Sequence, residues 1–286
     1  MKDGIASRTA YGAGRLRAAH QNDHPRVFDD PVAVRFLRPQ DAQAVQDKTT
    51  SGGPFARGLR MAIAARSRLV EDSLHEAVAR GVTQYVVLGA GFDTFAFRTP
   101  YKPEELRIFE VDHPDTQAAK RRLALQAGLE LPDALTLVPV DFAGESLAER
   151  LDLLGFDFKR PAFISFLGVT MYLETPALEH TLMTIATRCA PGTEIVFDYL
   201  MAPASIGLLD RIAMHLLAWR VARLGEPLRT FFDPDTLPAR LKSLGFSRAE
   251  PVDTKAMQER IRRENELPAS HKPPRMGMGG MMRAVV

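Results

Sequence analysis

The sequence has little cysteine, no long apolar run and almost no net charge. Its single cysteine, Cys189, cannot form a disulfide within the chain, which favours a reducing compartment. The start, MKDGIASRTA, lacks the apolar core of a secretory signal. The most apolar window, Ile206 to Val221, is interrupted by charged side chains and does not predict a membrane span. The 37 basic and 35 acidic residues nearly cancel, which argues against a nucleic-acid-binding surface. We therefore expect a cytoplasmic protein that binds neither nucleic acid nor membrane.

Short apolar runs alternate with helical patterns from about residue 81 onward, and this alternation predicts a parallel sheet with crossover connections. The first eighty residues instead carry helix signals, such as a long run from about Phe55 closed by Gly81. We expect 1–80 to form an N-terminal helical cap and 81–286 to form the main domain. Within it, 201–232 is expected to be a helical lid over a pocket, with a core helix as the alternative. The expected strands are Tyr85–Leu88, Arg107–Val111, Thr136–Val140, Ala162–Phe166, Glu194–Tyr199 and, as a last edge strand, MRAVV.

The stretch YVVLGAGFDTFAFR runs from an apolar strand into a turn with two glycines, Gly89 and Gly91, followed by a carboxylate. Glycines let the backbone approach a ligand, and the α-helix expected after the turn would offer free N–H groups. A dinucleotide site would carry a third glycine in G-x-G-x-x-G, but Asp93-Thr94 stands there. An acidic residue disfavours a pyrophosphate and suits a cationic ligand such as S-adenosylmethionine, with its sulfonium and ammonium groups. Alternatively, Asp93 is simply the N-cap of that helix.

Further carboxylates follow the second and third predicted strands. Glu110 and Asp112 come about twenty residues after the glycines, where a carboxylate can accept both ribose hydroxyls of a nucleoside. They point to the same side of the strand, so we expect one to bind ribose and the other to pair with a neighbour such as Arg98. Asp141 and Phe142, after the third strand, suit an adenine amino group and an adenine ring. Because open α/β sheets bind ligands at their carboxyl edge, these side chains predict one nucleoside site.

The chain resembles the leucine carboxyl methyltransferase family in five stretches whose order, spacing and residue type agree: YVVLGAGFDTFAFR, FEVDHPDTQAAK, PVDF, FISFLGVTMYLE and PGTEIVFDY. The likeness extends from SRTA near the start to GEPLRTFFDP and LKSLGF. The resemblance implies a class I, Rossmann-like α/β fold with a doubly wound, mostly parallel seven-stranded sheet. It also implies S-adenosylmethionine as the cofactor. The implied contacts are Gly89 and Gly91 near the methionine part, Asp112 on the ribose, Asp141 and Phe142 on the adenine, Arg66 (or Arg68) on the carboxylate, and Arg8 as a further basic contact.

One position departs from the family pattern, which commonly has Glu-Gly after the fourth strand where this chain has Leu167-Gly168. A polar contact is therefore missing or supplied from elsewhere. The resemblance implies an O-methyltransferase that acts on a small molecule or on a peptide C-terminus. A carboxylate acceptor is already ionised and needs no general base, whereas a hydroxyl acceptor needs one. Tyr172 is the candidate catalytic residue facing the acceptor. The other candidate bases are Tyr199, His215, His20 and His24, of which the last two are expected at the surface.

Two other functions are compatible with the sequence. A nicotinamide-dependent oxidoreductase would share a glycine turn, but the missing third glycine and the acids at the strand ends disfavour it. A non-catalytic nucleoside-binding scaffold would account for Leu167. No spacing of His, Cys, Asp and Glu indicates a metal site. No Asp-Pro-Pro-Tyr or Asn-Pro-Pro-Tyr segment follows the fourth strand, which disfavours methylation of a nucleic-acid base.

Overall fold

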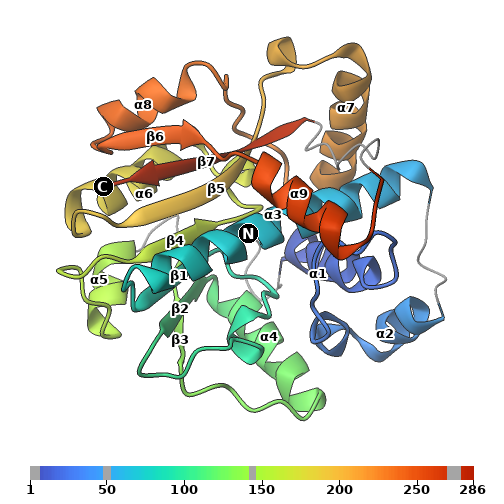
Figure 1. Cartoon of the computed structure of the whole chain (residues 1–286), viewed down its shortest axis with the longest axis horizontal. Helices are drawn as coiled ribbons and strands as arrows, with labels where there is room; N and C mark the ends of the chain where they lie inside the picture. The colour runs from blue at the N-terminus through green and yellow to red at the C-terminus, as the bar shows by residue number, and fades with distance from the viewer. Residues whose placement is uncertain (1–6, 48–52, 142–145, 269–277) are drawn as a thin grey trace.

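The computed structural model describes residues 7–47, 53–141, 146–268 and 278–286 (Figure 1). In these residues the five parallel strands form where the apolar runs predict them. The strands are β1 Gln84–Leu88, β2 Arg107–Asp112, β3 Leu135–Pro139, β4 Phe163–Phe166, β5 Glu194–Leu200, β6 Arg248–Pro251 and β7 Gly279–Val285. The α-helices are α1 Arg8–His20, α2 Pro39–Gln46, α3 Pro54–Ala79, α4 Pro114–Gln126, α5 Leu147–Leu153, α6 Thr175–Arg188, α7 Leu208–Arg223, α8 Leu237–Ser243 and α9 Lys255–Glu264. Short 3₁₀ helices are η1 Ala33–Phe36, η2 Phe95–Phe97, η3 Thr170–Tyr172 and η4 Pro203–Ser205.

The strands form one seven-stranded sheet in the order β3-β2-β1-β4-β5-β7-β6. The first five strands are parallel to one another, and β7 is antiparallel to both β5 and β6. The expectation that MRAVV is an edge strand is wrong, because it belongs to β7, which lies inside the sheet between β5 and β6. The edge is the short β6, which the sequence pattern did not indicate. Position in a sheet depends on pairing with distant strands, here β5 with β7 from Glu194↔Val285 to Leu200↔Gly279.

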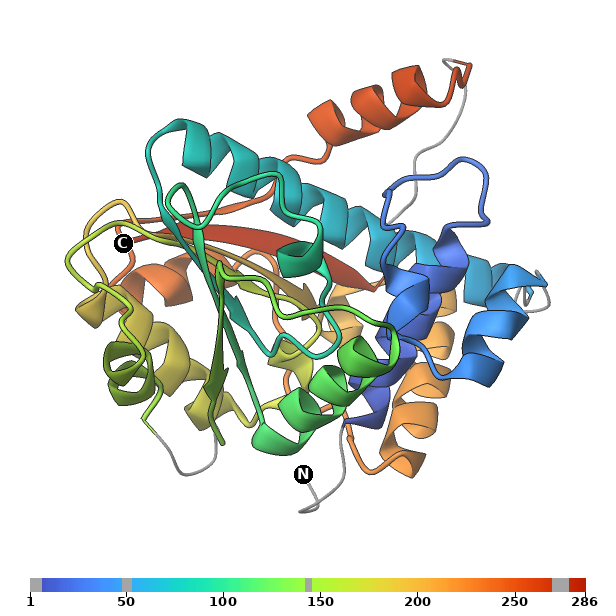
Figure 2. The ribbon, with the colours of Figure 1, turned by 90° about the horizontal axis from the view of Figure 1, so that it is seen from below.

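Side chains of the central strands alternate between two helical layers. Val86 and Leu88 of β1 pack in a core with α5, α6 and α8, whereas Tyr85 and Val87 pack in a second core with α3. Figure 2 shows these layers on opposite sides of the sheet. Burial on both faces is expected for parallel strands with helical crossovers. The strand ends, rather than the strand faces, are therefore where polar side chains gather.

Two expected helices are only 3₁₀ turns. The predicted α-helix after the glycine turn is wrong: the chain forms η2, whose Phe95 and Ala96 are buried in the core that contains α3. Because α3 already covers this face of the sheet, a full helix after β1 has no surface to cover. Asp30 and Pro31, as cap and first turn, predict a second helix over VAVRFL, but this segment forms only η1. There the Asp30 Oδ1 atom accepts the Ala33 N–H at 3.1 Å.

The N-terminal helices are joined by a buried polar cluster around His20. The expectation that His20 lies at the surface is wrong, since its side chain is fully buried. Its Nε2 atom accepts the Val27 N–H at 3.0 Å, which leaves Nδ1 to donate to Asp23 at 3.1 Å. Arg60 of α3 binds the same carboxylate through two hydrogen bonds of 2.7 and 2.9 Å. The cluster links α1 to α3. The predicted boundary at residue 80, between an N-terminal cap and a main domain, stays a prediction.

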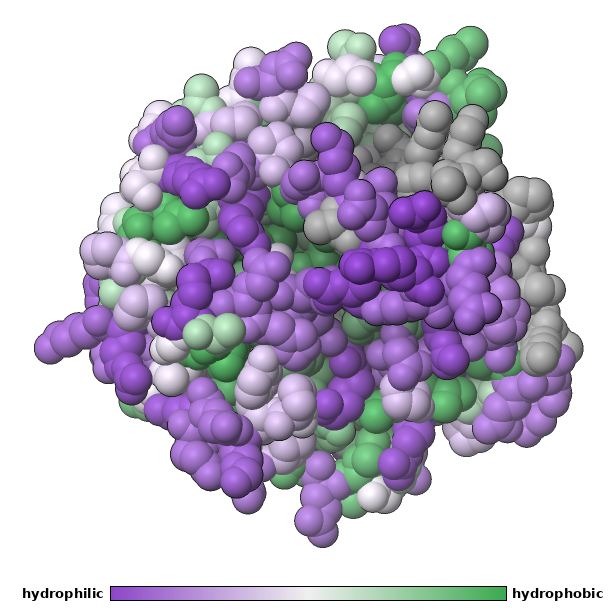
Figure 3. Space-filling view, in the orientation of Figure 1, coloured by the Kyte–Doolittle hydropathy of each residue, from purple (hydrophilic) through white to green (hydrophobic). Residues whose placement is uncertain are grey.

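The outer surface differs between α9 and α7. Hydrophilic side chains cover α9 in Figure 3, and Arg260 and Glu264 of α9 pair with Asp72 and Arg68 of α3. The molecule is more apolar at the corner where α7 lies. None of the helices in the described ranges combines the length and apolar character needed to cross a bilayer. A row along α7 has more than half of each side chain exposed: Leu208, Leu209, Ile212, Leu216 and Trp219.

We predict that His20 makes stability depend on pH between about 7 and 5. Burial lowers the pKa of His20, although Asp23 partly opposes the shift. Between the lowered folded pKa and about 6.5, the unfolded state binds a proton that the native state does not, so stability falls as the pH falls. The His20→Gln variant should have a shallower dependence, by at most about 1.4 kcal/mol per pH unit.

Urea unfolding of both proteins at several pH values measures this difference. The exposed His180 provides the matched control, and His180→Gln should keep the wild-type slope. An unchanged slope in His20→Gln would show that burial does not control the protonation of His20.

Candidate active site

The glycine turn lies at the carboxyl end of β1, closely packed against two other segments. Gly89 and Gly91 have φ values of +65° and +52°, a region that favours glycine. A Cβ atom on Gly89 would lie 2.2 Å from Val169, and one on Gly91 would lie 3.1 Å from the Cβ atom of Ala10 in α1. Both backbone conformation and space therefore require glycine. The residues after β4 and the start of α1 meet at this turn.

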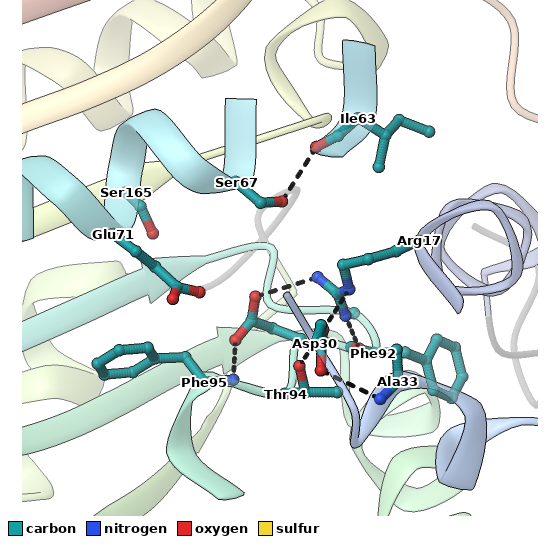
Figure 4. A network of polar contacts seen from close by, with 12 residues as sticks. Arg17, Asp30, Ala33, Ile63, Ser67, Glu71, Phe92, Thr94, Phe95 and Ser165 are labelled. Atoms are coloured by element: carbon teal, nitrogen blue, oxygen red, sulfur yellow. Dashed lines mark hydrogen bonds and ion pairs between the residues drawn. The ribbon is translucent and has the colours of Figure 1, made fainter. Parts of the chain in front are cut away.

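Asp93 belongs to a buried charge network centred on Arg17 of α1. Figure 4 shows Arg17 beside Asp30 and Phe92. Arg17 lies 3.0 Å from Asp30 and 3.4 Å from Asp93, and it donates to the Phe92 carbonyl at 2.5 Å. Asp93 also accepts the Phe95 N–H at 2.8 Å. Burial raises the pKa of Asp93, but the neighbouring Arg17, Lys120 and Arg98 outweigh burial and hold it below its ordinary value. The carboxylate predicted to face a cationic ligand is thus already balanced by protein cations.

The two acids of β2 have different partners. Glu110 forms a buried ion pair with Lys120 of α4, so the predicted partner Arg98 is wrong. Arg98 instead binds Glu71 of α3 and lies 3.3 Å from Asp30. Glu110 pairs with Lys120 rather than with Arg98 because α4 packs on the face of β2 from which Glu110 projects, and Lys120 lies on α4.

Asp112 lies beside the glycine turn at the end of β2. Its Oδ2 accepts the Gly91 N–H at 2.5 Å and its Oδ1 accepts the His113 N–H at 2.6 Å. Burial raises the pKa of Asp112, and these two backbone bonds partly oppose the shift. Asp141, after β3, is exposed at the same edge of the sheet, and Phe142 lies outside the described residues. The structure thus brings Asp112 to the glycine turn, as the sequence predicts.

Arg66 of α3 reaches the carboxyl edge of the sheet, where it pairs with Asp198 of β5 at 2.5 Å. The other Asp198 oxygen accepts the Gly168 N–H at 2.6 Å. A Cβ atom on Gly168, whose φ is +70°, would lie 2.8 Å from the Arg66 guanidinium. The alternative, Arg68, faces away from this edge and binds Asp72 and Glu264.

Tyr172 lies in η3, close to the pair formed by Arg66 and Asp198. Burial raises the pKa of Tyr172, with Arg66 and a hydrogen bond to the Thr9 side chain acting in the opposite direction. Among the other candidate bases, Tyr199 is buried against Phe232, and His215 and His24 are exposed. The described structure therefore brings only Tyr172 of the five candidates to Arg66.

Glu226, in the loop after α7, holds the start of α1 at this site. Its carboxylate accepts hydrogen bonds from the N–H groups of Arg8 and Thr9, at 3.2 and 3.3 Å, and from the hydroxyls of Ser7 and Thr9. A negative charge at a helix N-terminus stabilises the helix. The side chain of Arg8 itself is exposed and lies at a groove beside α1, away from Arg66.

Asp198, Thr9 and Glu226 were not predicted as site residues. Asp198 carries a signal that could have identified it, because it lies near the end of an apolar strand as Asp112 does. It also places a carboxylate beside Gly168, where the family Glu is replaced by Leu167. Glu226 carries no local signal, since its partners are 217 to 219 residues away in the chain. Among the described residues, no group of three His, Cys, Asp or Glu side chains is arranged to hold a metal ion.

Solved structures share this fold. A crystal structure from Thermobifida fusca that is named as a methyltransferase aligns with a TM-score of 0.57 at 16% identity, covering 99% of this chain and 96% of that one. A "duf574 family protein" from Streptomyces avermitilis aligns with a TM-score of 0.55 at 15% identity, covering 96% and 95%. These identities establish the fold alone. With the strand order and the strand-end site, they define the class: a class I, Rossmann-like methyltransferase fold.

Sequence relatives then identify the family. A Bacillus subtilis protein bearing the name of an S-adenosyl-L-methionine-dependent methyltransferase is 29% identical over 270 residues, 86% of this chain and 88% of that protein. A Streptomyces coelicolor protein of the same description is 31% identical over 214 residues, 72% and 71% of the two chains. The family model "Leucine carboxyl methyltransferase" matches residues 10–186. This chain therefore belongs to the leucine carboxyl methyltransferase family and is an S-adenosylmethionine-dependent methyltransferase, not an oxidoreductase or a scaffold.

We predict that Glu226→Gln loosens the start of α1. The variant loses the negative charge that four donors share, so the free energy of local opening should fall by about 1 kcal/mol. Hydrogen exchange of the Thr9, Ala10 and Tyr11 amides measures this opening. Glu130→Gln, at an exposed glutamate in the loop before β3, should leave the exchange rates unchanged. Equal rates in Glu226→Gln and wild type would show that Glu226 does not hold the helix.

Proposed function

We propose that this chain transfers a methyl group to a carboxylate or hydroxyl oxygen of a small-molecule acceptor, with a carboxylate as the better fit. The observation that supports this proposal is the cluster of hydrogen-bond donors at Tyr172. Arg66 and the Tyr172 phenol converge there, close to the glycine turn, whereas the Thr9 hydroxyl donates to Glu226. Donors of this kind suit an anionic oxygen.

The residues at the sheet edge fit the polar groups of S-adenosylmethionine, which when bound supplies a methyl group activated by the sulfonium charge. Asp112 offers carboxylate oxygens for ribose hydroxyls, because each oxygen accepts one backbone N–H and keeps a further lone pair. Arg66 offers a guanidinium for the methionine carboxylate, and its pairing with Asp198 leaves donors on the same group. We further propose contacts of Asp141 and Phe142 with adenine and of Arg8 with the methionine end. Asp93 would lie behind Gly89 and Gly91, where its negative charge would act on the cofactor without direct contact.

Tyr172 is proposed to orient the acceptor. Methyl transfer is an in-line displacement, so the protein must hold the acceptor oxygen aligned with the methyl carbon. Because burial raises the pKa of Tyr172, the phenol keeps its proton at neutral pH and acts as a donor rather than as a base. A carboxylate acceptor needs no base and gains from this donor, whereas a hydroxyl acceptor needs one. The carboxylates near Tyr172, Asp198 and Glu226, already accept hydrogen bonds from Arg66 and from the start of α1, which favours the carboxylate acceptor.

The segment 201–232, which contains α7, would cover the acceptor, and 1–80 would cap the cofactor. A peptide C-terminus is an alternative acceptor because it also ends in a carboxylate. The expected cytoplasmic location rests on the single cysteine, Cys189, which is buried and unpaired.

We predict that Asp112→Ala weakens S-adenosylmethionine binding at least about ten-fold, because hydrogen bonds to a carboxylate contribute about 1.5–3 kcal/mol each. Isothermal titration calorimetry measures the affinity, and circular dichroism verifies the fold. Asp133→Ala, at an exposed aspartate before β3, is the matched control and should bind as wild type does. Unchanged affinity in Asp112→Ala would contradict the ribose contact.

We predict that the product is a methyl ester. Wild-type protein with methyl-labelled cofactor would be incubated with extracts of small carboxylic acids, of phenols and alcohols, and of peptides. Alkali releases methanol from an ester but not from a methyl ether, so volatile label after alkali identifies a carboxylate acceptor. Tyr172→Phe should lower the rate at least about ten-fold through loss of a charge-assisted hydrogen bond.

Alkali-stable label would instead identify a hydroxyl acceptor and contradict the preference for a carboxylate. Label confined to the peptide extract would contradict the small-molecule acceptor. Full activity of Tyr172→Phe would contradict the role of the phenol.

A further inference from the structure

A groove of about 820 Å³ lies on the outer side of α1, between α1, the start of α2 and α4. Figure 2 shows α4 beside α1 along this side of the molecule. Arg8, Tyr11 and Arg15 face the groove from α1 because their spacing of three and four residues places them on one side of the helix. Thr9 and Ala10, which contact Tyr172 and Gly91, face other directions. The groove and the methyl-transfer site thus use different faces of α1.

The groove concentrates positive charge. Four arginines line it with one aspartate, Asp41, a surplus of three charges compared with a surplus of two for the whole chain. Asp41 is already occupied, since Arg15 pairs with it at 3.1 Å and the Tyr11 hydroxyl donates to it at 2.8 Å. The remaining three arginines, Arg8, Arg38 and Arg122, have no carboxylate partner among the described residues.

Other arginines near α1 do have carboxylate partners. Arg17, Arg60 and Arg98 all bind carboxylates within 3.5 Å. Leaving three guanidinium groups around one concavity costs mutual repulsion, which a bound anion would relieve. Because these groups are exposed, salt should screen the attraction.

The floor of the groove is aromatic. Tyr11 and Phe92 meet edge to face with their ring centres 5.5 Å apart, and Leu123 of α4 adds an apolar wall. The Arg38 guanidinium lies 4.9 Å from the centre of the Tyr11 ring, and the backbone N–H of Arg38 donates to the Tyr11 hydroxyl at 2.8 Å. This packing holds Arg38 at the rim of an apolar floor. An apolar floor with a cationic rim suits a ligand with a flat apolar body and charges at its edges.

We propose that this groove is a second binding site, for a small organic anion that carries two or more negative charges on an apolar, planar body. Arg38 and Arg122 bind the charged groups from opposite sides, and Tyr11, Phe92 and Leu123 contact the body. Asp112, Arg66 and Asp198 do not line the groove. Among the described residues proposed to contact the cofactor, only Arg8 lines it, and Arg38 and Arg122 rather than Arg8 bind the anion.

The test uses calorimetry on the whole chain with benzene-1,3,5-tricarboxylate as the probe. Benzoate, with one charge, and pyrophosphate, with no apolar body, are the comparison ligands. We expect the tricarboxylate to bind at least about ten-fold more tightly than either, and raising NaCl from about 0.05 to 0.3 M to weaken it. Pyrophosphate binding as tightly as the tricarboxylate would overturn the apolar part of the proposal.

The matched variants are Arg122→Gln and Arg121→Gln, at neighbouring exposed arginines of α4 of which only Arg122 lines the groove. Arg122→Gln should weaken the tricarboxylate at least about ten-fold, and Arg121→Gln should not. Both variants should bind S-adenosylmethionine as wild type does, which verifies the fold. Equal loss in both variants, or no tricarboxylate binding at millimolar concentration, would overturn the proposal. Displacement of S-adenosylmethionine by the tricarboxylate would overturn the separation of the two sites.

Discussion

The arrangement of the site depends on the buried ion pairs that Arg17 makes with Asp30 and Asp93. These charges join three segments: α1, the loop before η1 and the turn after β1. Arg98 extends the network from Asp30 to Glu71 of α3. Removing one partner from such a buried pair typically costs about 3–5 kcal/mol, because the other charge stays buried without compensation. The network therefore fixes α1 relative to the glycine turn, and with it the positions of Thr9 and Ala10.

A second consequence concerns the charges at the cofactor edge. Asp112 has a raised pKa because it is buried, whereas Asp93, a few residues from Gly91, is held ionised by cations from α1 and α4. Arg66 is balanced by Asp198 rather than by a residue at position 167. The edge thus presents the carboxylate of Asp112 at β2 and the guanidinium of Arg66, paired with Asp198, at β5. In the proposed cofactor site, Asp112 would meet the ribose hydroxyls and Arg66 the methionine carboxylate.

Local features of the sequence predicted much of this structure. Apolar runs placed five strands, Gly81 placed the end of α3, and two glycines with Asp112 placed the turn, because each signal acts within a few residues. The partners of the charged side chains were not predictable in the same way. Glu110 pairs with Lys120, Asp93 with Arg17, and His20 lies buried against Asp23 because of how separate helices pack. The inner position of β7 was missed for the same reason, since a strand pattern does not encode its neighbours.

The inner position of β7 also constrains how the protein is made. During synthesis β5 and β6 leave the ribosome before β7, so neither has its hydrogen-bonding neighbour from residues 279–285 until this last strand in chain order appears. Until then the newly made chain carries an unpaired strand edge, the kind of surface that recruits other chains. In the completed sheet β7 lies between β5 and β6, and a Cβ atom on Gly280 would lie 2.6 Å from the Tyr199 ring. A glycine near the end of the chain therefore serves the completion of the sheet as well as its final packing.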